Sequence, residues 1–190
     1  VQHSVHTFYN HTFVGKHILT VGGDYMRDYL MSYQFANNGS KHQYTVDGFA
    51  QFDWNPTKYF NVITGLRFDY YSDSDINHFS PKLGLMYKIG NCSLRGSYAG
   101  GFRAPTLKEM YMNFDMASIF MIYGDPDLKP ETSHNFSLSA EYMKGRYNLT
   151  VTGFYNVVDN RITTAWSEAL KGQVYTNISN IKISGAEANA

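Results

Sequence analysis

Apolar and polar side chains alternate one by one over long stretches of this chain. In the segment 146–157, Leu149, Val151 and Tyr155 fall on one face, while Thr150 and Thr152 fall on the other. A period of two residues is that of a β-strand with one apolar and one polar face. The same alternation runs through 44–54, 60–70, 81–89, 92–99 and 134–142, and less cleanly through 1–13, 17–31 and 173–190. The pattern therefore predicts nine strands.

The predicted strands are long, and their connections follow a rhythm. About ten residues cross a bilayer at a tilt of about 45°, whereas strands of globular proteins average about 5–6 residues. Short turns alternate with long loops, and the long loops are expected at 32–42, 71–79, 101–131 and 159–172. This rhythm is typical of an outer-membrane barrel with periplasmic turns and extracellular loops. We therefore predict an all-β, antiparallel, up-and-down transmembrane β-barrel that forms one domain over 1–190.

The composition agrees with a two-faced sheet and excludes several classes of partner. Sixteen Tyr and thirteen Phe accompany a mean hydropathy of −0.37, which suits one apolar face against outer-membrane lipid and one wet face that lines a lumen. Sixteen basic and sixteen acidic residues balance, so the charge gives no reason to expect nucleic acid as a partner. The lumen-facing charges, such as Arg67, Asp69 and Arg95, are expected either to pair across strands or to contact a domain inside the lumen. Because an open sheet cannot span a membrane alone, we expect the nine strands to belong to a larger barrel.

The stretch from Tyr98 to Thr132 interrupts the alternation and carries turn chemistry at both ends. Pro105 forces the residue before it out of the helical region, and Arg103 supplies a forked donor for carbonyls or carboxylates. An Asp-Pro-Asp sequence at 125–127 predicts a turn. We interpret both ends as hinges of one long loop. The hinge residues are Phe102, Arg103, Ala104, Pro105, Asp125, Pro126, Asp127 and Leu128.

These two motifs resemble the FRAP-type and NPDL-KPE boxes of the TonB-dependent outer-membrane receptor family. The second box departs from the family pattern by Asp125 in place of Asn. Segments 48–54, 65–71, 79–87 and 175–187 are similar to the family as well. The resemblance implies a bacterial outer-membrane barrel of about 22 strands, with an N-terminal plug and TonB-contacting region that are absent here. It also implies energy-coupled import of a scarce ligand, with 101–131 as the extracellular ligand-gating loop.

The centre of this loop is apolar enough to contact a ligand or a partner. Methionine and aromatic surface suits a flat or greasy ligand, although the same side chains can instead pack the loop onto its neighbours. The candidate contacts are Met110, Met112, Phe114, Met116, Phe120, Met121 and Tyr123. The apolar surface favours haem or cobalamin over a ferric siderophore or a glycan. Haem receptors of this family often carry a histidine between the boxes, and 106–124 contains none, which weakens a haem interpretation. A surface lipoprotein is a further candidate partner at these loops.

Other functional classes are less well supported. A passive porin or adhesin barrel is the main alternative, and a soluble carbohydrate-binding β protein is another. No Ser-His-Asp or similar motif indicates an enzyme, and we predict neither catalytic residues nor an intrinsic cofactor. His3 and His6 fall on opposite faces of their strand, so we predict no metal site there.

Overall fold

A single sheet contains every strand of the residues that the structure describes. The structure, a computed structural model, describes residues 2–13, 16–32, 39–73, 75–116 and 119–190. Nine long strands and two short ones are joined in the order β1-β2-β3-β4-β5-β6-β9-β10-β11-β8-β7. The long strands are β1 (Gln2–Phe13), β2 (His17–Met31), β3 (Ser40–Trp54), β4 (Phe60–Tyr71), β5 (Ile76–Ile89), β6 (Cys92–Arg103), β9 (Glu131–Lys144), β10 (Tyr147–Ser167) and β11 (Gly172–Asn189).

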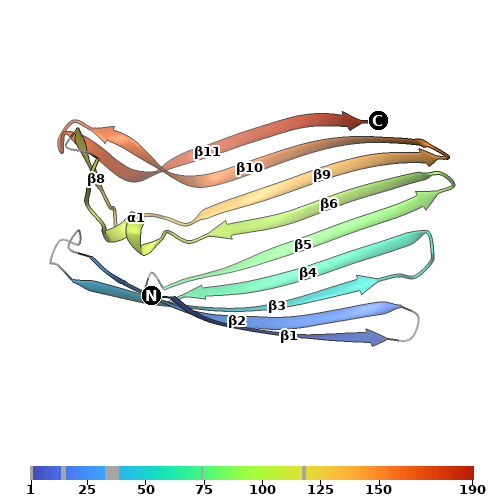
Figure 1. The fold of residues 1–190 in the computed structure, drawn as a ribbon, viewed down its shortest axis with the longest axis horizontal. Coiled ribbons are helices and arrows are strands. Elements are labelled where there is room, and N and C mark those ends of the chain that lie inside the picture. The colour runs from blue at the N-terminus through green and yellow to red at the C-terminus, as the bar shows by residue number, and fades with distance from the viewer. Residues whose placement is uncertain (1, 14–15, 33–38, 74, 117–118) are drawn as a thin grey trace.

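The long strands pair antiparallel with their neighbours in chain order, except that β6 pairs with β9. Between these two lie helix α1 (Leu107–Tyr111) and the short strands β7 (Phe114–Met116) and β8 (Phe120–Tyr123). β8 adds to β11 in parallel, and β7 pairs with β8. The predicted fold class, an all-β up-and-down meander of nine long strands, is confirmed (Figure 1). No helix of the described ranges is long and apolar enough to cross a membrane.

The two ends of the sheet differ. At the turn end, tight connections join β1 to β2, β3 to β4, β5 to β6 and β9 to β10. At the opposite, loop end lie α1, β7 and β8 (Figure 1). The predicted long loop at 101–131 therefore exists as the connection 104–130. The predicted loop at 32–42 lies mostly outside the described residues.

Two predicted long loops are wrong. β5 begins at Ile76, directly opposite Tyr71, and the predicted loop at 71–79 shrinks to residues 72–75. β10 continues to Ser167, opposite Gly172, and the predicted loop at 159–172 shrinks to 168–171. Strand pairing continues in both places although apolar and polar residues no longer alternate cleanly there. Above a membrane both faces of a hairpin meet water, so the alternation that marks a strand disappears.

The register places charged side chains in one row on the lumen face. Asp24, Asp47 and Asp69 lie directly opposite one another on β2, β3 and β4. Arg67 bridges two of them, with Nη2 2.9 Å from Asp47 Oδ2 and Nε 2.9 Å from Asp69 Oδ1. Farther round the sheet, Arg95 Nη2 lies 2.8 Å from Glu141 Oε2. The expected pairing across strands is confirmed for Arg67 and Arg95.

The aromatic residue Phe154 interrupts the polar face, and its neighbour on the adjacent strand explains why. Phe154 on β10 lies opposite Gly185 on β11. A Cβ on Gly185 would come within 2.6 Å of the Phe154 ring, so the ring covers the bare glycine backbone.

Candidate functional site

The 104–130 loop folds inward over the polar face of the sheet at the loop end. Helix α1 contacts β3, which is three strands away from β6 in the path around the sheet through β5 and β4. The Lys41 ammonium on β3 lies 3.9 Å from the centroid of the Tyr111 ring on α1, a cation–π contact. The loop therefore lies against the lumen wall (Figure 1).

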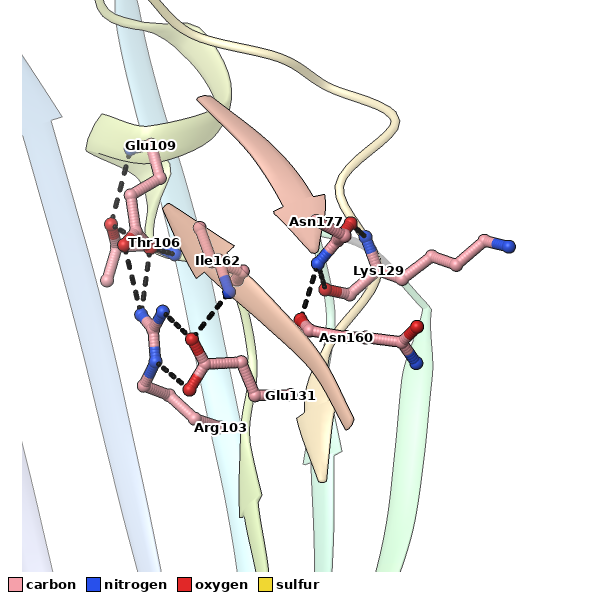
Figure 2. A network of polar contacts seen from close by, with 8 residues as sticks. All are labelled: Arg103, Thr106, Glu109, Lys129, Glu131, Asn160, Ile162 and Asn177. Carbon is pink, nitrogen blue, oxygen red and sulfur yellow. Dashed lines mark hydrogen bonds and ion pairs between the residues drawn. The ribbon is translucent and has the colours of Figure 1, made fainter. Parts of the chain in front are cut away.

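Arg103 holds both ends of this loop together. It is the last residue of β6 and lies opposite Glu131, the first residue of β9. Its Nη2 donates to Glu131 Oε1 at 2.8 Å and its Nε donates to Glu131 Oε2 at 3.1 Å. Its Nη1 donates to both carboxylate oxygens of Glu109 on α1, each at 3.0 Å (Figure 2). Glu131 Oε1 also accepts a hydrogen bond from the Ile162 N–H at 2.7 Å, which connects the ion pair of Arg103 and Glu131 to β10. Forked charge-assisted bonds of this kind are strong and directional.

Glu109 has a second role as the capping residue of α1. The Glu109 N–H donates to Thr106 Oγ1 at 3.2 Å, and the Thr106 N–H donates to Glu109 Oε2 at 2.8 Å, which together form a capping box. Pro105 is fully buried and has a fixed φ, so it sets the chain direction before the cap. The Glu109 carboxylate therefore caps the start of α1 and also pairs with Arg103.

The second box is fixed by its own turn and by β11. The Asp127 N–H donates to Asp125 Oδ1 at 2.9 Å, as expected of an Asp-initiated turn. Asn177 on β11 accepts the Lys129 N–H at 2.7 Å and donates to the Lys129 carbonyl at 2.9 Å. Asn177 also donates to the Asn160 carbonyl at 2.7 Å (Figure 2). One amide thus holds the loop against both β10 and β11.

The two boxes also pack on each other. Met110 on α1, Leu128 of the second box and Ile162 on β10 form a buried cluster, with exposures of 5%, 6% and 7%. The Asp125 N–H donates to the Glu109 carbonyl at 3.0 Å. At Gly124 an added Cβ would lie 2.8 Å from the Met110 backbone, so only a glycine permits this close approach.

The candidate contact residues divide into a packed group and an accessible group. Met110 is buried in the cluster above, so the structure uses this side chain for packing. Met112, Phe114, Phe120, Met121 and Tyr123 are half-buried, and Met116 is 45% exposed. The Phe114 ring lies 4.8 Å from the Lys108 ammonium. β7 and β8, which the sequence did not predict, carry most of the accessible group, and their role as ligand contacts stays a prediction.

A groove of about 440 Å³ separates the loop from the wall. The loop contributes residues 102–108, and the strands contribute side chains from β1, β2, β3 and β4. Sequence reasoning did not find the strand contribution, because these side chains meet the loop only through the register. They are Gln2, Met26, Asp28, Tyr29, Leu30, Gln43, Thr45 and Tyr71.

The groove contains no histidine among the described residues that line it. The nearest aromatic partner of Phe102 is His78 on β5, whose ring stacks on Phe102 with centroids 4.4 Å apart and planes 11° apart. β5 and β6 stop pairing beyond Lys82 and Ala99, and His78 and Phe102 both lie in the part where these two strands are not paired with each other. Pro81, which has no N–H to donate, stands where the ladder stops.

Tyr111 is the one titratable group of the loop with a large perturbation. Burial, together with the hydrogen bond to Asp73, raises the pKa of the Tyr111 hydroxyl to about 12. The phenol therefore stays neutral and joins α1 to the β4–β5 hairpin.

Metal ligation has little support in the described part of the chain. No group of three or more His, Cys, Asp or Glu side chains there is arranged to hold an ion. His6 Nδ1 lies 2.8 Å from Asp24 Oδ1, an ordinary hydrogen-bonded pair.

Comparison with known proteins agrees on one family. The family model described as "TonB dependent receptor-like, beta-barrel" matches residues 2–190. The chain is 31% identical over 157 residues to the iron-regulated outer membrane virulence protein of Vibrio cholerae serotype O1, covering 79% of this chain and 24% of that protein. It is 37% identical over 90 residues to hemoglobin and hemoglobin-haptoglobin-binding protein C of Haemophilus influenzae, covering 47% and 8%.

The fold matches as well. The crystal structure of the siderophore receptor PirA from Pseudomonas aeruginosa superposes with a TM-score of 0.85 at 19% identity, covering 98% of this chain and 36% of that one. The chain spans about a quarter of the length of the Vibrio relative.

Proposed function

Because this chain belongs to the TonB-dependent receptor family and forms part of its outer-membrane β-barrel, we propose that the whole receptor imports a ferric siderophore with energy supplied through TonB. The 104–130 loop acts as the extracellular gate, and the groove beneath it receives part of the ligand. The observation that carries the proposal is the groove itself, which lies between a clamped loop and the lumen wall.

The chemistry of the groove favours an anionic iron chelate over haem. No described residue that lines it is a histidine, the commonest axial ligand of haem iron. Lys108 lines the groove with its ammonium beside the Phe114 ring, a pairing that suits an aromatic anion. The Met110 side chain is buried in the packed cluster, so the loop exposes less apolar surface than its composition indicates. Similar proteins include a siderophore receptor and a haemoglobin-binding protein, so both chemistries belong in the test.

Equilibrium binding to the full-length receptor in detergent tests the proposal. Ferric enterobactin, haem and cyanocobalamin are the three probes. We expect ferric enterobactin to bind, and Lys108→Ala to weaken that binding about tenfold, as loss of a charge-assisted contact does. Lys129→Ala is the matched control, because Lys129 contacts Asn177 only through its backbone. Binding of haem alone, or equal effects of the two substitutions, would contradict the proposal.

A further inference from the structure

A second concave site lies at the opposite end of the lumen. Residues of the β1–β2 turn, the β3–β4 connection and β5 line a pocket of about 450 Å³. Asn61 and Met86, which face each other across β4 and β5, form its wall on the lumen face. The pocket therefore lies at the mouth of the lumen on the turn end, which is the periplasmic end in this family architecture.

Three lysines line this pocket: Lys16, Lys58 and Lys88. Among the described residues none of the three forms an ion pair. The neighbouring acid, Asp53, already accepts hydrogen bonds at Oδ1 from the side-chain amides of Asn55 and Asn61. The described residues that line the pocket include these three lysines and no acid, so the lining carries an excess of positive charge.

The frame that carries these lysines is built from hydrogen bonds between separate strands. The Asn55 side chain donates to the Lys16 carbonyl at 3.0 Å, and the Asn55 N–H donates to His17 Nδ1 at 3.1 Å. The Lys88 N–H donates to the Tyr59 carbonyl at 2.8 Å. The Lys58 ammonium lies 4.9 Å from the Tyr59 ring centroid. Two connections and strand β5, which are distant in sequence, are thus held together as one cationic pocket.

We propose that this pocket is an anion-binding site at the periplasmic mouth, and that its ligand is the anionic iron chelate as it leaves the lumen. The choice of cargo rests on the proposed function, whereas the anion site rests on the lysines alone. A concave surface lined by one sign of charge concentrates counter-ions and speeds their capture. The effect acts within a Debye length of about 8 Å at physiological salt, so the site serves an anion already inside the mouth. The lumen-facing wall favours a small soluble anion over a lipid headgroup.

The test uses the full-length receptor in nanodiscs and the triple variant Lys16→Gln, Lys58→Gln, Lys88→Gln. Inorganic pyrophosphate, titrated calorimetrically at low salt, probes the site without reference to the cargo. We expect the triple variant to bind pyrophosphate about tenfold more weakly than the wild type. Lys144→Gln, at the end of β9 and outside the pocket, should bind as the wild type does. Equal pyrophosphate affinity in the triple variant and the wild type would overturn the anion site.

The claim that the pocket binds the iron chelate is tested by uptake of radioactive iron from ferric enterobactin in whole cells. We expect the triple variant to keep its surface affinity and to import more slowly by a factor of about three to ten. Unchanged uptake, together with lost pyrophosphate binding, would overturn the cargo assignment. A receptor that binds pyrophosphate at these lysines and does not bind ferric enterobactin would refute the proposed function and the cargo assignment while supporting the anion site.

Discussion

Substitution of Arg103 by methionine should detach the 104–130 loop from the lumen wall. The change removes the forked donor from Glu131 and the paired donor from Glu109, and leaves two carboxylates facing each other. Those carboxylates are mostly buried, with side-chain exposures of 16% for Glu109 and 18% for Glu131. Without Arg103 they repel each other and must recruit water or protons.

The size of the effect follows from this geometry. Loss of one partner from a fully buried ion pair costs about 3–5 kcal/mol. The Arg103 side chain is 41% exposed, so water screens part of the interaction, and we scale the cost to about 2–3 kcal/mol. The penalty falls on local docking of the loop rather than on the barrel, because the strand ladders do not depend on this side chain.

Hydrogen exchange in the full-length receptor measures that docking directly. A loss of about 2–3 kcal/mol corresponds to exchange that is about 30-fold to 150-fold faster at the protected loop amides. The diagnostic amides are the Met110 and Asp125 N–H groups, which donate within the loop. Arg95→Gln is the control, because Arg95 lies on the same strand and pairs with Glu141 in the barrel wall. Loop exchange within twofold of the wild type in Arg103→Met, or equal acceleration by Arg95→Gln, would refute the clamp.

Three further predictions concern the same loop. Asn177→Ala removes three hydrogen bonds and should lower the free energy of loop docking by about 1–3 kcal/mol. The second box should then become a site of rapid limited proteolysis, and resistance equal to that of the wild type would contradict the prediction. Tyr111 should titrate near pH 12 by site-assigned tyrosine NMR, and Asp73→Asn should lower that pKa. Because the pKa is raised above the ordinary value of about 10, the contribution of Tyr111 to the free energy of loop docking should be fully present below about pH 10 and be lost as the pH rises towards 12. Gly124→Val would place a side chain against the Met110 backbone, so hydrogen exchange of the loop amides should accelerate while the barrel keeps its thermal transition. Unchanged exchange of the loop amides would show that Gly124 does not lie tightly against Met110.

The alternation of apolar and polar side chains was sufficient to predict the strands of the barrel wall, but not the parts of the strands that extend above the membrane. Side-chain alternation identified β9 and β10 because the membrane keeps one face apolar, and it failed at Asp159, Asn160 and Arg161, where β10 extends beyond that constraint. Arg103 was expected to clamp carbonyls or a carboxylate, but its partner Glu131 lies 28 residues away and is reached only through the β6–β9 register.

Some of the site could have been found from sequence. Thr106 and Glu109 have the spacing of a capping box, which marks the start of α1 and the carboxylate nearest to Arg103. The wall of the groove could not have been found this way. Gln43 and Thr45 carry no motif, and they meet the loop only because the sheet curves enough for α1 to contact β3.

The central claim is that the clamped loop over the groove senses a ferric siderophore. Hydrogen exchange of the α1 amides in the full-length receptor, measured with ferric enterobactin and separately with haem, tests it most directly. We predict that ferric enterobactin slows exchange across Leu107–Tyr111 by about tenfold or more, and that haem leaves it unchanged. Ferric enterobactin that binds without protecting α1, or haem that protects it instead, would contradict the account.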